Sequence, residues 1–368
     1  MDFTFDGDQE ALRTTARAFL AGVSGPRLRS LVDGDGAPAA IERLWARSVE
    51  LGWPGLLVPA SDGGAGAGML EATVLMEEMG ALPLPGPWLS SSVAGTLAAV
   101  RLGDADMLPH LAAGTRRATV AVEETGTRDP LDGIAVTARR EGSGWRLHGL
   151  KPVVIDGDTA DVVYVVARDP EGGAGLAGFA VSDPAAEPVP GLDVTRTLAR
   201  LVLDGRPARR LGPAGDQRAL WARIVDDIGI ALCAESVGAA ERALTMASDY
   251  ARQRVQFDRP IATFQVIRHK IVDMLHQLEL ARVATHHAAW ASAVDDPDRE
   301  AATAMAKAVV AEAATQITAE NIQVHGGVGF TWDLDCHLLF RRVKANDVLF
   351  GRQGWQRQRL ADLVVDRL

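Results

Sequence analysis

The period of the hydrophobic residues changes twice along this 368-residue chain. Residues 1–115 carry apolar side chains at helical spacing. Over residues 116–215 the apolar runs become short, alternating or valine-rich, and Gly, Asp and Pro separate them, which predicts antiparallel strands. Long alanine-rich helical runs return over residues 216–368. This order predicts an α+β fold with an N-terminal helical domain, a central antiparallel β-domain and a C-terminal helical domain.

The C-terminal part reads as three long helices, over residues 216–255, 262–293 and 298–323. The links between them are short and contain Asp and Pro, which interrupt helices. Short links favour antiparallel packing of neighbouring helices. The C-terminal domain is therefore predicted to be a helical bundle.

Charge and composition exclude several classes of protein. A net charge of -10 argues against general nucleic-acid binding, which needs a basic face. Cys233 and Cys336 lie far apart without CxxC spacing, so we expect neither a disulfide framework nor a zinc site, and a reducing cytoplasm fits best. The acidic N-terminus lacks the features of a signal peptide, and no apolar run reaches the ~18 residues of a membrane span.

Several local motifs have an ordinary explanation. His286 and His287 are adjacent on a predicted helix and point in different directions, whereas His269 and His276 lack a carboxylate arranged between them. We therefore expect no metal site. The glycines of residues 64–68 do not follow a strand of the Rossmann type, so they favour a helix connection over a phosphate-binding loop.

Four segments resemble signature regions of the acyl-CoA dehydrogenase family. Residues 250–265 contain YARQRVQFDRPI followed by Phe-Gln, and residues 323–344 contain QVHGGVGFTW and then RRVK. Residues 51–59, LGWPGLLVP, and residues 77–80, EEMG, resemble the N-terminal part of the family. The resemblance extends over essentially the whole chain, including the order of helices and strands.

The resemblance implies a tetramer made of two dimers, with a four-helix C-terminal domain in each subunit. FAD is then expected at a dimer interface, with its flavin ring on the β-domain of one subunit and its ADP part on the C-terminal helices of the neighbour. A glutamate in such enzymes removes the α-proton of an acyl-CoA, the β-hydride passes to the flavin, and an electron-transfer flavoprotein is the expected acceptor.

Six residues match those that reach into the neighbouring subunit's FAD. An arginine can pair with pyrophosphate oxygens, and two adjacent glycines let backbone amides approach a ligand closely. The alternative is a surface charge followed by an ordinary turn. The six cofactor-binding candidates are Arg254, Phe257, Gln265, Gln323, Gly326 and Gly327.

The catalytic base that the resemblance implies is missing. Many family members place the glutamate 27 residues after the glutamine that matches Gln323 and just before a glycine. Phe350 occupies that position here, followed by Gly351. Phenylalanine cannot accept a proton, so no catalytic residue is predicted at this place.

The second base position of the family is also changed. It lies 29 residues before the phenylalanine that matches Phe257, and Ile228 stands there. Asp227 is adjacent, but one residue rotates a helix by about 100°. Asp226 or Asp227 as a substitute base remains an alternative, against the interpretation that both are solvated acids on the surface of a helix.

The segments that should hold the chain's own flavin are altered too. Val153 and Ile155 follow the GLK motif where family members have a Trp-Ile-Thr/Ser segment. Glu123 replaces a threonine, and its carboxylate would repel a reduced, anionic flavin. Arg352 and Gly354 replace residues that contact adenosine.

The residues that match those reaching into a neighbour's FAD are present, whereas the segments that should hold the chain's own flavin are altered. This contrast predicts a heteromer. The family includes α2β2 assemblies that oxidise bulky steroid side-chain CoA thioesters, with one FAD per heterodimer. We interpret this chain as the non-catalytic subunit of such an acyl-CoA dehydrogenase, whose partner subunit carries the catalytic glutamate. Two alternatives remain, a self-sufficient homotetramer that uses Asp227 or another acid, and a silent acyl-CoA-binding or scaffold protein.

Overall fold

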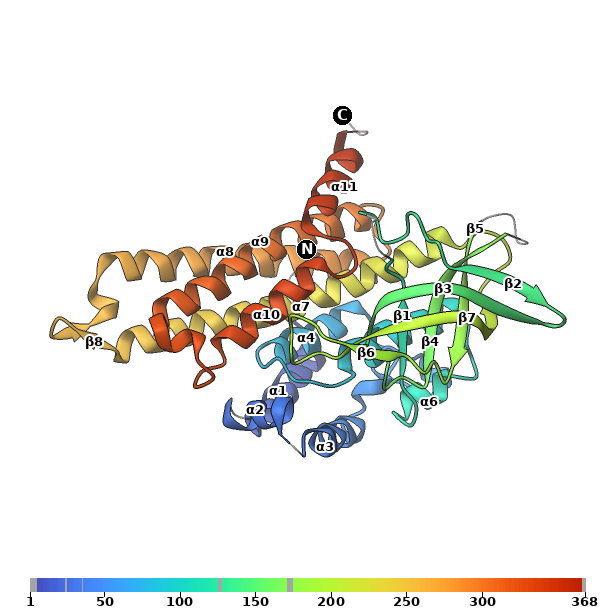
Figure 1. The fold of residues 1–368 in the computed structure, drawn as a ribbon. Helices are drawn as coiled ribbons and strands as arrows, with labels where there is room; N and C mark the ends of the chain where they lie inside the picture. The colour runs from blue at the N-terminus through green and yellow to red at the C-terminus, as the bar shows by residue number, and fades with distance from the viewer. Residues whose placement is uncertain (1–4, 24, 35, 125–127, 171–174, 366–368) are drawn as a thin grey trace.

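A computed structural model describes residues 5–23, 25–34, 36–124, 128–170 and 175–365 (Figure 1). Helices form both ends of the chain and a sheet lies between them, which confirms the predicted α+β fold. The N-terminal elements are α1 (Gly7–Ala21), α2 (Gly25–Asp33), α3 (Ala37–Glu50), η1 (Trp53–Gly55), η2 (Ala60–Asp62), α4 (Met69–Gly80), the π-helical η3 (Trp88–Gly95), α5 (Thr96–Leu102) and α6 (Leu108–Ala112).

The described part of the central sheet has seven strands in the order β1-β4-β2-β3-β7-β5, with β6 beside β7. Strand β5 pairs with both β7 and β4, so the sheet closes on itself. The pairing was expected to be antiparallel throughout, but β4 pairs in parallel with β1 and with β2. The strands are β1 (Ala118–Ala121), β2 (Thr137–Glu141), β3 (Gly144–Ile155), β4 (Val162–Asp169), β5 (Gly175–Ser182), β6 (Glu187–Val189) and β7 (Leu198–Leu211).

The C-terminal bundle contains the three long helices that the sequence predicts. Figure 1 shows α7, α8 and α9 side by side, with α10 and α11 against them. A small hairpin, β8–β9, joins α7 to α8. The elements are α7 (Arg218–Gln253), β8 (Val255–Gln256), β9 (Arg259–Pro260), η4 (Ile261–Thr263), α8 (Gln265–Ala293), α9 (Arg299–His325), η5 (Gly326–Phe330), α10 (Cys336–Val348) and α11 (Gln353–Val365).

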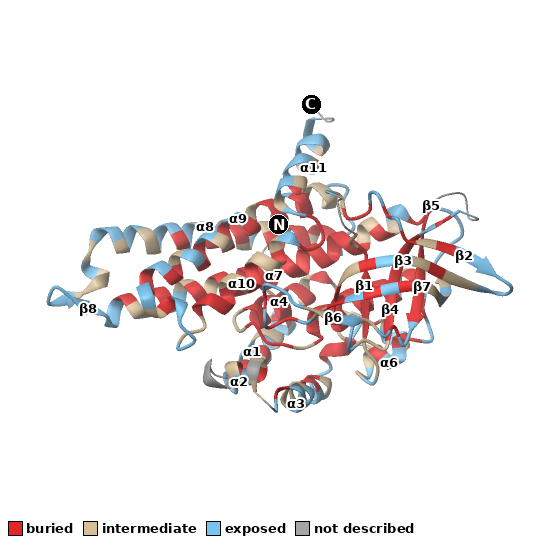
Figure 2. Ribbon diagram, viewed as in Figure 1, coloured by how far each residue is buried: buried red, intermediate tan, exposed pale blue. Residues whose placement is uncertain are grey.

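Helix α7 is the centre of the molecule. Every residue from Ile224 to Ala240 is buried, because α4, α8, α9 and α10 surround this part of the helix (Figure 2). The backbones of α4 and α7 touch where both helices carry glycine. A Cβ atom on Gly238 would lie 1.7 Å from the carbonyl oxygen of Glu77, and one on Gly80 would lie 2.0 Å from that of Glu235. These two glycines fix how the N-terminal helices sit on the bundle.

The described helices include none that is long and apolar enough to cross a membrane. Cys233 and Cys336 are both buried and unbonded to each other.

Candidate functional site

The β8–β9 hairpin presents a phenylalanine at its tip. Phe257 and Asp258 both have positive φ, 53° and 64°, as the two central residues of a type I′ turn require. The flanking residues Gln256 and Arg259 pair across the turn. Phe257 is 86% exposed, so its ring is available for contact with another molecule.

The hairpin is attached to the bundle on both sides. Arg254 ends α7 in an extended conformation, and its N–H donates to the carbonyl of Tyr250 at 2.8 Å. Gln265 is the first residue of α8. The Arg254 and Gln265 side chains are both exposed.

The end of α9 lies at the same end of the bundle as the start of α8. The two helices run antiparallel, and Lys270 Nζ bonds Glu320 Oε2 at 2.5 Å. The ring of His325 stacks on that of Tyr250, with 4.4 Å between the centroids, which links α9 to the end of α7. Gln323, on the last turn of α9, is exposed.

Two exposed glycines follow α9. Gly326 has φ 65° and ψ −143°, a backbone conformation that essentially only glycine adopts. Open space surrounds the Cβ positions of Gly326 and Gly327. Residues 254–265 and 323–327 thus form one exposed surface at the end of the bundle, which we call the arm.

A cavity of about 500 Å³ lies elsewhere, where the sheet domain meets the end of α10. The described residues that line it come from the sheet domain and from the end of α10 with the connection to α11. They are Glu123, Glu124, Arg128, Pro130, Pro152, Val153, Leu192, Asp193, Arg196 and Leu198 on the first side, and Lys344, Ala345, Val348, Leu349, Gly351 and Arg352 on the second. Residues 125–127, part of the altered flavin segment of the sequence, lie outside the described residues.

Glu123 fixes the loop after α10 from inside this cavity. The N–H of Phe350 donates to Glu123 Oε1 at 2.8 Å, and the N–H of Gly351 also bonds the carboxylate. On the other side, Lys307 Nζ donates to the carbonyls of Asn346 and Leu349 at 3.0 and 2.9 Å. Burial raises the pKa of Glu123 above its usual value, and the two N–H groups oppose this shift. The loop is held from both sides.

Neither of the two positions where the resemblance implies the base offers a proton acceptor. Phe350 has φ 54° and is 4% exposed, and Ile228 on α7 is fully buried. Both side chains belong to the same hydrophobic core. Val153 lines the cavity, whereas Ile155 also packs into that core.

The two aspartates beside Ile228 are not solvated surface acids, so that interpretation is wrong. Asp226 is buried and forms a bidentate pair with Arg359 of α11, at 2.6 and 2.8 Å. Asp227 is also buried, pairs with Arg101 of α5 and accepts the Ser292 hydroxyl at 2.5 Å. Because arginines hold both carboxylates in place, Asp227 loses support as a substitute base.

Lys151, in the GLK motif, is completely buried beneath the cavity. Its Nζ donates to the carbonyl of Val122 at 2.8 Å and to Glu124 Oε1 at 2.7 Å. Burial lowers the pKa of Lys151 to about 8, and the carboxylate of Glu124 limits the fall. This pair joins β3 to the segment that carries Glu123.

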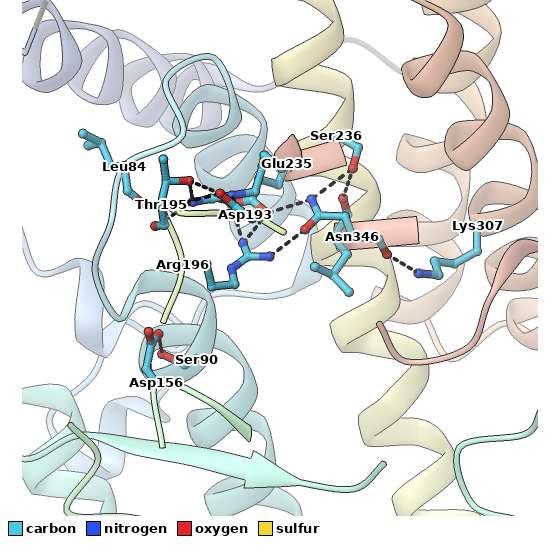
Figure 3. A network of polar contacts seen from close by, with 12 residues as sticks. Leu84, Ser90, Asp156, Asp193, Thr195, Arg196, Glu235, Ser236, Lys307 and Asn346 are labelled. Carbon is cyan, nitrogen blue, oxygen red and sulfur yellow. Dashed lines mark hydrogen bonds and ion pairs between the residues drawn. The ribbon is translucent and has the colours of Figure 1, made fainter. Parts of the chain in front are cut away.

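A buried ionic network lies behind the cavity and was not found from the sequence (Figure 3). Arg196 contacts both Glu235 and Asn346, at 2.6 Å each, and Arg342 bonds Glu235 at 2.5 Å and also pairs with Asp193. Burial opposes ionisation of Glu235, but the two arginines lower its pKa to about 2. The partners are up to 150 positions apart, so spacing alone gives no signal for them.

Comparison with known proteins fits these observations to one family. The model of the acyl-CoA dehydrogenase N-terminal domain matches residues 6–115, and that of the C-terminal domain matches residues 228–364. Acyl-CoA dehydrogenase IpdE2 of Mycobacterium tuberculosis is 30% identical over 339 residues, which cover 91% of both chains. This chain belongs to the acyl-CoA dehydrogenase family. IpdE2 of Mycolicibacterium smegmatis is 29% identical over 96% of this chain and 97% of its own.

Solved structures of acyl-CoA dehydrogenases share the whole fold. A variant of the Tcur3481-Tcur3483 steroid ACAD is 30% identical with a TM-score of 0.86, over 98% of each chain. The ChsE4-ChsE5 complex from Mycobacterium tuberculosis contains a chain that is 27% identical with a TM-score of 0.87, over 100% of this chain and 99% of that one. FAD is the cofactor of this family of oxidoreductases.

The arm and the cavity differ in how well they suit FAD. The arm offers an exposed guanidinium, an exposed aromatic ring and backbone in a glycine-only conformation, which fit a diphosphate and a ring system. The cavity instead presents the carboxylate of Glu123, which disfavours a reduced, anionic flavin. Apolar Val153 lines the same cavity. The described residues contain no cluster of three or more His, Cys, Asp or Glu that could hold a metal.

Proposed function

We propose that this chain is the non-catalytic subunit of an FAD-dependent acyl-CoA dehydrogenase complex. Its arm binds the ADP part of an FAD whose flavin ring lies on a partner subunit. That partner supplies the catalytic glutamate. The observation that carries the proposal is the contrast between the exposed arm and the two base positions, Phe350 and Ile228, which are filled by core side chains.

The distance between arm and cavity supports the use of the arm in another subunit. Asn346 lies next to Ala345, which lines the cavity, and contacts Ser236 on α7. Arg254 lies at the far end of α7, about 27 Å further along the helix at 1.5 Å per residue. One FAD bound to this chain's arm is therefore expected to place its flavin ring against a different chain.

Each arm residue has a separate role in this proposal. The guanidinium of Arg254 pairs with pyrophosphate oxygens, and the absence of side chains at Gly326 and Gly327 lets the cofactor approach the backbone closely. The N–H of Gly326 itself donates to the carbonyls of Gln323 and Ile322 at the end of α9. Phe257 packs against the cofactor, and Gln265 and Gln323 supply amide hydrogen bonds. FAD, when bound, accepts the β-hydride of the acyl-CoA.

Relatives support a bulky substrate for the complex. A steroid ACAD is similar over almost the whole chain, and so is a subunit of the ChsE4-ChsE5 complex. We propose an acyl-CoA with a steroid side chain as substrate and an electron-transfer flavoprotein as acceptor.

Replacing Arg254 by alanine in the complex tests the arm. The loss of a charge-assisted contact costs about 1.5–3 kcal/mol, so we expect FAD to dissociate more readily by about 10- to 100-fold, measured by flavin fluorescence after dilution. Arg252→Ala is the matched control, because Arg252 is also exposed but pairs with Asp249 on its own helix, at 3.3 Å. Unchanged FAD affinity in the Arg254→Ala complex would mean that the arm does not bind the cofactor.

A further inference from the structure

We propose that the cavity between the sheet domain and α10 binds a small amphipathic anion, an apolar ring or chain that carries one acidic group. This inference rests on the proposed function in one respect, that flavin does not occupy this cavity. The cavity then becomes a second ligand site of the complex, separate from the FAD that the arm holds.

One side of the cavity is an apolar wall. Pro152 and Val153 line it from β3, Leu192 from the segment before β7, Leu198 from the start of β7, and Val348 from α10. Leu192 is 57% exposed and Val348 is 44% exposed, so this wall is open to a ligand rather than filled by the protein. A volume of about 500 Å³ suits a compact ring system or a folded chain.

Most charged groups around the cavity are already neutralised by partners. Asp193 and Arg196 belong to the buried network with Glu235 and Arg342, whose two positive and two negative charges balance. Glu124 pairs with Lys151, and Lys344 Nζ pairs with Asp347 at 2.9 Å. These groups give the cavity no net charge.

Two arginines remain, and they leave the cavity positive. Arg128 and Arg352 line the cavity, both are exposed, and no ion pair joins either of them to another described residue. Glu123 is the one opposing charge, and its carboxylate accepts the N–H groups of Phe350 and Gly351. With Glu123 ionised the excess is one positive charge, which favours an anion over a neutral or cationic ligand.

The apolar wall and the excess charge together set the class of ligand. Burial of the apolar part against Val153 and Leu198 supplies the affinity, and the acidic group faces Arg128 and Arg352. A free carboxylate of an apolar acid has this chemistry.

Calorimetric titration of the full-length chain with decanoate tests the inference. Decyltrimethylammonium has the same chain length and the opposite charge, and we expect it to bind at least about tenfold more weakly than decanoate. The double variant Arg128→Gln/Arg352→Gln should lose about tenfold in decanoate affinity. Arg139→Gln, an exposed arginine on β2 away from the cavity, should leave the affinity unchanged.

A variant that fills the cavity locates the site. Val348→Trp changes a residue that is exposed at the rim, so the chain should keep its melting temperature and lose decanoate binding. Absence of decanoate binding, equal binding of the two probes, or binding that neither the arginine nor the Val348 change affects would overturn the proposal. None of these residues belongs to the arm, so FAD retention in the Arg254→Ala complex tests the proposed function independently.

Discussion

Phe350 stands at a position where the resemblance to the family implies the catalytic base. Its side chain packs in the same core as Ile228, so both places where the family carries a glutamate are filled with apolar atoms. Its backbone N–H donates to the carboxylate of Glu123.

Phe350→Glu should therefore not restore activity. A base acts only when the α-carbon is held between it and a flavin that can take the hydride. The new carboxyl would replace a core phenyl ring, and we expect a loss of about 3–5 kcal/mol in unfolding free energy. Phe350→Leu is the control and should cost less than about 1.5 kcal/mol. Flavin bleaching by acyl-CoA in a single turnover of the Phe350→Glu chain alone would contradict the proposal.

Glu123 should make the protein less stable as the pH rises. An acid whose pKa is raised by folding holds its proton more tightly in the native state, so unfolding becomes easier above about pH 4.5, the ordinary range of a glutamate. Glu123→Gln has no charge to bury. We expect the variant to gain stability relative to the wild type between pH 4 and pH 8, measured by urea unfolding. If the difference in unfolding free energy between Glu123→Gln and the wild type stays constant across that range, the pKa of Glu123 is not raised by folding.

The buried network acts at the scale of elements. Asp193 and Arg196 precede β7, Glu235 lies on α7, and Arg342 and Asn346 lie on α10. It therefore ties the sheet domain to two helices of the bundle. Such a balanced network gives little net stability, but removal of one partner leaves uncompensated charge in the core.

Glu235→Gln should cost about 3–5 kcal/mol of unfolding free energy near neutral pH. Because the pKa of Glu235 is lowered to about 2 in the folded protein, its contribution should be complete above about pH 4.5 and disappear as the pH falls toward 2. The matched control is Glu187→Gln, since Glu187 pairs with Arg200 on the surface, at 2.5 Å, and should contribute below about 1 kcal/mol. Equal costs for the two variants would contradict the role of the network.

Hydrophobic periodicity predicted most of the helices, but it did not predict the contacts between segments that are distant in sequence. The predicted runs 262–293 and 298–323 correspond closely to α8 and α9. All strands of the central sheet, β7 included, lie within residues 116–215, for which the sequence predicts strands. The parallel pairings of β4 and the burial of Asp226 depend on chain segments that are distant in sequence, which local pattern does not encode.

At the scale of the whole molecule, arm and cavity lie apart, the arm at the end of the bundle and the cavity between the sheet domain and α10. Helix α8 also carries exposed apolar residues at helical spacing, Val272, Leu275, Leu280 and Val283. Exposed apolar faces of this kind mark contacts with other subunits. We therefore expect another chain to cover this face of α8 in the proposed complex.

Equilibrium dialysis of FAD against the purified chain, alone and with its partner subunit, tests the central claim most directly. The proposal predicts almost no FAD on the isolated chain, because its arm lacks the partner's flavin site and its own cavity presents Glu123. With the partner present, about one FAD per two polypeptides should bind. A stoichiometry near one FAD per chain for the isolated protein would contradict the proposal.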